Sequence, residues 1–158
     1  MRKLLMLVAT LTAALAGFAA SSASAAAPVA VQIRLHPKVF APVQIGTWDA
    51  SGGIDDSGTY VRTDVHSTGS LPDCFCTLEH NGAFQEEFLL TGSQGTLTLK
   101  DETLVTPFDE PSPFGEVRVV WQIESGTGAY DRATGHGKGD FGPPLTLYLD
   151  GVVSKVGD

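Results

Sequence analysis

Apolar and polar residues alternate along most of the chain, and glycine or proline interrupts the alternation every 8 to 14 residues. Val29–Leu35 is typical, with valine, isoleucine and leucine at every second position. A period of two places successive side chains on opposite faces of an extended strand, and no helical period follows the N-terminal apolar run. The pattern predicts about nine strands: Val29–Leu35, Val43–Asp49, Thr59–His66, Cys74–His80, Ala83–Leu90, Gly95–Lys100, Val117–Ile123, Ala133–Asp140 and Leu145–Val153.

Short antiparallel strands without helices between them leave sheet edges that must be protected. Closure into a barrel removes those edges. One hairpin signal is local: Asn81-Gly82 joins Cys74–His80 to Ala83–Leu90, which we expect to pair. The predicted fold is all-β, a single small antiparallel closed β-barrel of about eight strands.

Three glycines, Gly135, Gly137 and Gly139, occupy alternate positions of one predicted strand. Glycine weakens a flat strand, so such a row is typical of a strand that coils tightly or is crossed by a bulky side chain. Aromatic side chains can cover strand glycines, and Trp48 and Trp121 are the candidates here. We interpret the row as structural.

The N-terminus has the features of a secretory signal peptide: the basic Arg2 and Lys3, an apolar run to Ala20, and the small residues Ala23-Ser24-Ala25. The apolar run is shorter than the roughly 20 residues that a membrane-spanning helix needs. We therefore expect a secreted protein, extracellular or periplasmic, that does not stay in the membrane after cleavage. The expected organisation is a signal peptide at 1–25, an N-terminal arm and first strand at 26–45, and the barrel domain at 46–158.

The chain is acidic, with 18 acidic and 10 basic residues. Removal of Arg2 and Lys3 leaves eight basic residues and a formal charge of −10. A surface of that sign repels phosphate groups, which argues against nucleic acid and anionic membranes as partners. The remaining length of about 133 residues suits one domain with one core.

Cys74 and Cys76 are the two cysteines of the chain. Export favours a disulfide between them, but residues i and i+2 of a regular strand lie too far apart for relaxed disulfide geometry. The Pro72-Asp73 dipeptide upstream would supply the necessary kink. The alternatives are free or intermolecular thiols, and metal ligation with His80, although the C-x-C-x3-H spacing lacks a fourth ligand of a recognised zinc pattern.

The most polar predicted strand, Thr59–His66, supplies the candidate site. Alternation would place Tyr60, Arg62, Asp64 and His66 on one face. Facing the barrel interior, this row would offer a cation, a carboxylate and an imidazole to one ligand. Facing outward, it would leave the threonine and valine row in the core, which is the arrangement that a small filled barrel favours.

Other motifs add little chemistry. Gly137–Gly142 matches G-x-G-x-x-G, but Pro143-Pro144 prevents the helix that a dinucleotide site requires. The acidic stretch Asp49–Asp56 lacks the spacing of a calcium loop. Adjacent acids such as Glu86-Glu87 and Asp101-Glu102 would point to opposite faces of a strand, and most acidic pairs are expected in solvated turns. The sequence predicts no metal and no cofactor.

The segment Trp121–Gly137 has the sequence W-Q-I-E-S-G-T-G-A-Y-D-R-A-T-G-H-G, and Gly46-Thr47-Trp48 and Asp56-Ser57-Gly58-Thr59 precede it. Together these segments resemble exported bacterial proteins of the allene oxide cyclase barrel-like group, which is similar to plant dirigent proteins and allene oxide cyclases. The resemblance implies an eight-stranded antiparallel barrel with an apolar cavity open at one end, and self-association as a dimer or trimer. It supplies no catalytic positions, because the matching residues belong to turns and packing: Gly126, Gly128, Tyr130, Gly135 and Gly137.

We expect the barrel to bind a small apolar or aromatic ligand without chemistry. The candidate ligand-binding residues are Tyr60, Arg62, Asp64, His66, Trp121 and Tyr130. The expected cavity walls are Phe84, Phe88, Leu97, Leu99, Trp121 and Ile123. One alternative is a filled barrel that serves as a protein-interaction or structural module, and a second is a cyclase- or dirigent-like catalyst.

Overall fold

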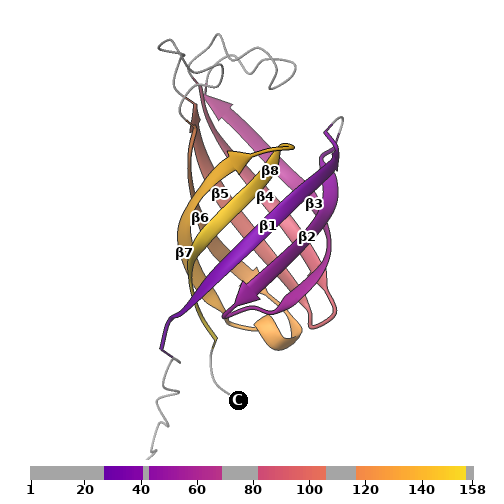
Figure 1. Cartoon of the computed structure of the whole chain (residues 1–158), viewed down its shortest axis with the longest axis vertical. Coiled ribbons are helices and arrows are strands. Elements are labelled where there is room, and N and C mark those ends of the chain that lie inside the picture. Colours follow the sequence, from indigo (N-terminus) through magenta and orange to yellow (C-terminus); the bar gives the residue numbers. More distant parts are fainter. Residues whose placement is uncertain (1–26, 41–42, 69–81, 106–116, 156–158) are drawn as a thin grey trace, which may run out of the picture.

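The computed structural model describes residues 27–40, 43–68, 82–105 and 117–155 of the 158-residue chain. These residues form eight antiparallel strands that close into one barrel, with neighbours in chain order (Figure 1). The predicted closed β-barrel is confirmed. The strands are β1 (Val29–Val39), β2 (Ile45–Gly52), β3 (Asp56–Thr68), β4 (Gly82–Gly92), β5 (Thr96–Val105), β6 (Val117–Gly126), β7 (Thr134–Gly142) and β8 (Thr146–Ser154). A short 3-10 helix, η1 (Gly128–Tyr130), lies between β6 and β7.

The first strand closes the barrel, because β1 pairs with both β2 and β8. Ile33, at the middle of β1, lies opposite Ala50 on one side and Leu149 on the other. The barrel therefore includes Val29–Val39 as a full strand. Among the described residues, no helix is long and apolar enough to cross a lipid bilayer.

One predicted pairing is wrong. The predicted strand Cys74–His80 and the turn residue Asn81 lie outside the described residues. Ala83–Leu90 was expected to pair with that strand, but it lies in β4, whose two edges are occupied by β3 and β5. An Asn-Gly signal indicates where a chain reverses, whereas the neighbours of a strand are decided by closure of the whole sheet.

Alternate residues of the strands fill the interior. In β1 the buried residues are Val31, Ile33 and Leu35, and the residues between them are partly exposed. The same period of two runs through β5 and β6. All six residues expected to line the interior are buried: Phe84, Phe88, Leu97, Leu99, Trp121 and Ile123. They belong to a core that also contains Trp48, Ile54, Leu90, Leu147 and Leu149.

Trp121 covers the glycine row at Gly137. The indole Nε1 donates hydrogen bonds to backbone oxygens of β7 and β8, at 3.2 and 3.3 Å. A Cβ at Gly137 would lie 2.0 Å from the Asp150 carbonyl oxygen and 2.7 Å from Nε1 of Trp121, so no side chain fits there. The predicted aromatic cover is confirmed for Trp121. It is wrong for Trp48, whose ring lies instead against Gly92.

Gly137→Ala is expected to lower the free energy of unfolding by about 2–3 kcal/mol, because the added methyl group must separate β7 from β8 or displace the indole. Urea unfolding followed by tryptophan fluorescence measures this loss. Lys138→Ala, at the exposed next residue, is the matched control and is expected to change stability by less than about 0.5 kcal/mol. Equal effects of the two substitutions would contradict the close contact of Trp121 with this strand.

Candidate functional site

The polar row predicted on Thr59–His66 is divided by a β-bulge in β3. Arg62 lies opposite Phe88 of β4, but Asp64, two residues further on, lies opposite the adjacent residue Glu87. One extra residue in β3 shifts the alternation by one, so the side chains beyond the bulge change face. The four predicted residues of this strand therefore do not form one site.

Because of the bulge, the side chains of Tyr60 and Arg62 lie on the inner face of the barrel, whereas those of Asp64 and His66 lie on its outer face. Tyr60 is 3% exposed and the Arg62 side chain 16%. Asp64 and His66 contact each other at 2.9 Å on the outer surface, where their side chains are 53% and 76% exposed. The expectation that the threonine and valine row would fill the core is also wrong, because Thr59 is exposed.

Tyr60 packs against the core and keeps its hydroxyl paired. Its Oη accepts a hydrogen bond from Gln44 Nε2 at 3.1 Å, and its ring meets that of Phe88 edge-on, with 5.8 Å between centroids. Burial raises the pKa of Tyr60 to about 12. The phenol is therefore neutral at physiological pH.

Arg62 pairs with Glu86 of β4 in the interior. Arg62 Nη1 donates to Glu86 Oε1 at 2.5 Å, and the Glu86 side chain is only 3% exposed. Burial raises the pKa of Glu86, although the hydrogen bond and positive charge of Arg62 oppose the rise. Each charge depends on the other, because removal of one partner would leave an uncompensated buried charge.

Asp101 of β5 lies directly opposite Glu86 and is the second acid of the interior. It is 1% exposed, and neither carboxyl oxygen forms a hydrogen bond with a described residue. Burial raises the pKa of Asp101 to about 8, and the negative charge of Glu86 adds to the rise. The Glu86 N–H and Arg62 oppose it, but that N–H lies outside hydrogen-bond geometry. The hydroxyl of Thr103, also 1% exposed, is likewise unpartnered among the described residues.

We call these four residues, Arg62, Glu86, Asp101 and Thr103, the interior acid site. The site contains two carboxyl groups but only one guanidinium, which pairs with Glu86, so the charges do not balance when both acids are ionised. Buried polar atoms without partners are rare in folded proteins and expensive to keep. The neighbouring inward side chains are aromatic or aliphatic: Trp121 and Val119 on β6, and Phe84 and Phe88 on β4.

The sequence interpretation missed Glu86 and Asp101, because it treated them as members of solvated acidic pairs. The signal in the sequence that could have identified them is their position in the alternation of each strand. Glu86 continues the buried series of Phe84 and Phe88, and Asp101 continues that of Leu99. An acid at a position that the alternation assigns to the buried, apolar face of a strand points into the core.

Tyr130, another predicted ligand-binding residue, closes one end of the barrel instead. It is fully buried at the end of η1, and its Oη donates to Asp56 Oδ2 at 2.8 Å. The same carboxylate accepts the hydroxyl and N–H of Ser93 and the N–H of Gln94. Partial burial alone would raise the pKa of Asp56, but the hydrogen bonds hold it well below its usual range. We interpret this cluster as a structural clasp between β3, the β4–β5 turn and η1.

Tyr130→Phe is expected to lower the free energy of unfolding by about 1–2 kcal/mol, because the Asp56 carboxylate loses a buried donor. Asp56 contributes stability above its unfolded pKa of 3.8, and this contribution is lost only as the pH falls towards its much lower pKa in the folded protein. The carboxylate is therefore still ionised in the barrel at pH 3, and the difference between Tyr130→Phe and the original chain should persist at that pH. Urea unfolding at pH 7 and pH 3 measures it, with Tyr148→Phe on β8 as the control. A deficit that disappears at pH 3 would contradict the role of the ionised Asp56.

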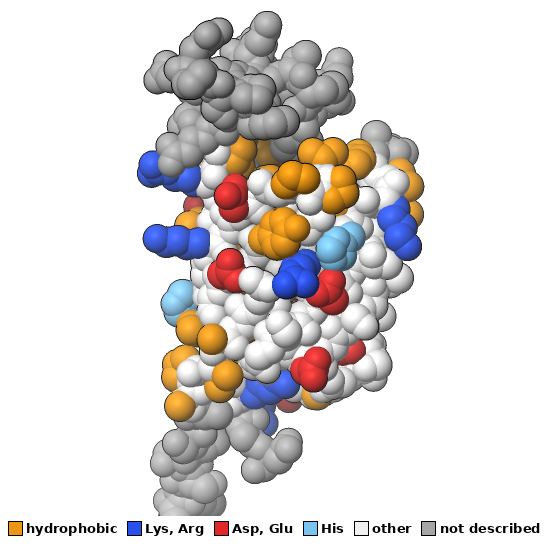
Figure 2. Space-filling view, in the orientation of Figure 1, with side chains coloured by type: hydrophobic (Ala, Val, Ile, Leu, Met, Phe, Trp, Pro, Cys, Tyr) orange, Lys and Arg blue, Asp and Glu red, His pale blue; other side chains and the backbone are white. Residues whose placement is uncertain are grey.

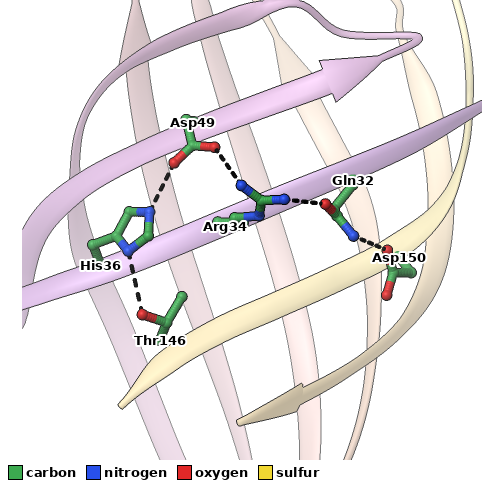
Figure 3. A network of polar contacts seen from close by, with 6 residues as sticks. All are labelled: Gln32, Arg34, His36, Asp49, Thr146 and Asp150. Carbon is green, nitrogen blue, oxygen red and sulfur yellow. Dashed lines mark hydrogen bonds and ion pairs between the residues drawn. The ribbon is translucent and has the colours of Figure 1, made fainter. Parts of the chain in front are cut away.

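A second polar network lies on the outer wall, where it joins β1 to β2 and β8 (Figure 3). Asp49 accepts from His36 Nε2 at 2.7 Å and lies 3.7 Å from an Arg34 nitrogen. Gln32 links Arg34 to Asp150, and Thr146 contacts the other ring nitrogen of His36. The Arg34, His36 and Asp49 side chains are between 41% and 47% exposed, so this network adds little stability per contact. His36 lies within β1.

Apolar side chains are exposed around the connection between β1 and β2, and Figure 2 shows hydrophobic side chains along the upper rim of that view. Val39, Phe40, Val43 and Ile45 are each between 43% and 46% exposed. A groove of about 370 Å³ beside them is lined by residues of β1 to β4, including Lys38, Ile45, Val61 and Leu89. None of the four residues of the interior acid site lines this groove.

The predicted disulfide falls outside the residues that the structure describes. Cys74 and Cys76 lie outside the described residues, so their disulfide stays a prediction. Within the described segments, no three His, Cys, Asp or Glu side chains form a group that could hold a metal ion.

Comparison with protein-family models, curated proteins and solved structures found no match to this chain. The resemblance to the allene oxide cyclase barrel-like group stays a prediction.

Proposed function

We propose that this chain is a secreted β-barrel protein that binds a small, largely apolar or aromatic molecule inside the barrel, without chemistry. Three observations support the proposal: the acidic composition, the basic and apolar N-terminal segment, and the interior acid site. The observation that carries it is a pair of buried groups that have no hydrogen-bond partner in the described part of the chain, the Asp101 carboxyl and the Thr103 hydroxyl. An interior built only for packing gains nothing from them, because an apolar side chain of similar volume fills the same space at lower cost.

The surroundings of Asp101 suit such a ligand. Ligand sites in proteins combine apolar walls with a few polar groups that orient the bound molecule. Trp121 lies beside Asp101 on β6, and Phe84 lies beside Thr103 on β4. The aromatic side chains would contact the body of the ligand, and the two polar groups would hold its hydrogen-bonding end.

Native mass spectrometry of the chain purified from its own host tests the proposal. We expect a co-purifying mass that is lost under denaturing conditions. The double variant Asp101→Leu with Thr103→Val should lose that mass, whereas Asp49→Asn on the outer wall should keep it. In the same spectrum, a protein mass two hydrogens below the reduced value would support the Cys74–Cys76 disulfide.

A filled barrel that acts as a protein-interaction module is the second candidate. The continuous core favours it, since Trp48, Phe88 and Trp121 all occupy the interior. A protein free of any bound molecule when purified from its host would overturn ligand binding and favour this alternative.

A further inference from the structure

Three buried oxygen atoms of the interior acid site have no hydrogen-bond partner among the described residues. They are the two carboxyl oxygens of Asp101 and the hydroxyl oxygen of Thr103, two residues apart on the inward face of β5. When Asp101 is ionised, its oxygens only accept hydrogen bonds, and the hydroxyl accepts as well. A primary ammonium group has three N–H donors and no acceptor, so it matches this set. A carboxylate or phosphate would meet only acceptors and repulsion at Asp101.

The charges of the site favour a cation for the same reason. Among the described residues, the ionisable groups that act on Asp101 are Glu86, directly opposite on β4, and Arg62 from β3. Tyr60, also on β3, interacts with Glu86 and Arg62. Its neighbour on β6 is the uncharged Trp121. Glu86 already takes the guanidinium of Arg62 at 2.5 Å, so Asp101 lacks a counter-charge of its own. Burial raises the pKa of Asp101 to about 8, which favours the neutral, protonated carboxyl at pH 7 when no ligand is bound. A bound cation would replace the proton.

The walls of the site suit the remainder of such a molecule. Trp121, Phe84 and Phe88 face inward next to the two polar groups. Aromatic rings attract cations through their π-faces and also contact apolar groups. An ammonium head on an apolar body would therefore find partners for both parts.

We propose, on the basis of the interior binding proposed above, that the ligand is a small organic cation with a primary ammonium head and an apolar or aromatic body. The ammonium donates to Asp101 and Thr103, and binding releases one proton from Asp101.

Calorimetric titration of the full exported chain at pH 7 tests this with two matched pairs of probes: 2-phenylethylamine with 2-phenylethanol, and hexylamine with hexanol. We expect the amine of each pair to bind about ten-fold or more tightly than its alcohol, since its hydrogen bonds are charge-assisted. The binding enthalpy should depend on the ionisation enthalpy of the buffer, with release of about one proton per amine at pH 7.

Two variants measure how much Asp101 and Thr103 each contribute to amine affinity. Asp101→Asn keeps the volume of the side chain and removes the charge, so amine affinity should fall about ten-fold while alcohol affinity changes less than about two-fold. Thr103→Val should weaken the amine about three-fold. Asp49→Asn, on the outer wall, is the control and should change neither.

The outcomes distinguish this inference from the function on which it rests. Alcohols that bind as well as amines would overturn the proposal that the ligand is a cation, and so would an amine preference that survives Asp101→Asn. Either result would leave the proposal of interior binding in place. A molecule that co-purifies from the host but lacks a basic nitrogen would do the same. A chain that carries no molecule from its host and binds none of the four probes would overturn both proposals.

Discussion

Arg62→Met is expected to lower the free energy of unfolding by about 3–5 kcal/mol, the largest effect of any single substitution considered in this protein. The methionine fills most of the same space but leaves Glu86, which is 3% exposed, without its counter-charge. Asp101 lies opposite Glu86, so the variant would hold two buried acids and no cation. Urea unfolding at pH 7 measures the loss, which should decrease at pH 5 as Glu86, whose pKa rises further without Arg62, becomes protonated.

The matched control is Arg34→Met on the outer wall. Arg34 also faces an aspartate, but both side chains are more than 40% exposed, and the expected loss is about 1 kcal/mol or less. A double variant, Arg62→Met with Glu86→Leu, should recover most of the stability, because the unpaired charge is gone. Equal losses at Arg34 and Arg62 would contradict the burial of the pair.

Asp101→Asn is expected to remove much of the pH dependence of stability between pH 5 and pH 8. In the unfolded chain Asp101 loses its proton near its usual pKa of 3.8, whereas in the barrel it keeps the proton up to about pH 8. The folded state therefore binds one more proton in this window, and stability falls as the pH rises through it. The slope is at most about 1.4 kcal/mol per pH unit for one group, which gives a loss of roughly 2–4 kcal/mol from pH 5 to pH 8.

Urea unfolding at pH 5, 6.5 and 8 compares the original chain with Asp101→Asn. The original chain should be most stable at pH 5, and the variant should show a flatter dependence, with a residual slope from the raised pKa of Glu86. Glu102→Gln changes the exposed neighbour on the same strand and should leave the slope intact. An unchanged slope in Asp101→Asn would show that this carboxyl is already ionised in the barrel at pH 5.

The alternation of apolar residues was sufficient to predict the architecture. Val29–Leu35 and Gly95–Lys100 have a strict period of two, which a chain without helices satisfies by forming a sheet with one face buried. The glycine row with Trp121 nearby indicated a covered, coiled strand, and the contact at Gly137 confirms it. These features are local in the sequence, so they need no knowledge of the neighbouring strands.

The arrangement of the candidate site could not be predicted from the sequence, because it depends on how β3 pairs with β4. One extra residue in β3 placed Asp64 and His66 outside while Arg62 stayed inside, and nothing in Thr59–His66 marks where the bulge falls, because it is set by the pairing with β4.

The sequence by itself therefore determined an all-β chain whose alternating strands form a closed barrel, because strand period and turn residues act over a few positions. Only the tertiary structure decided which strands are neighbours, on which side of the wall each polar residue of β3 lies, and that Glu86 and Asp101 face each other. Those facts depend on register between segments that are distant in the chain, and register is fixed when the eight strands close together.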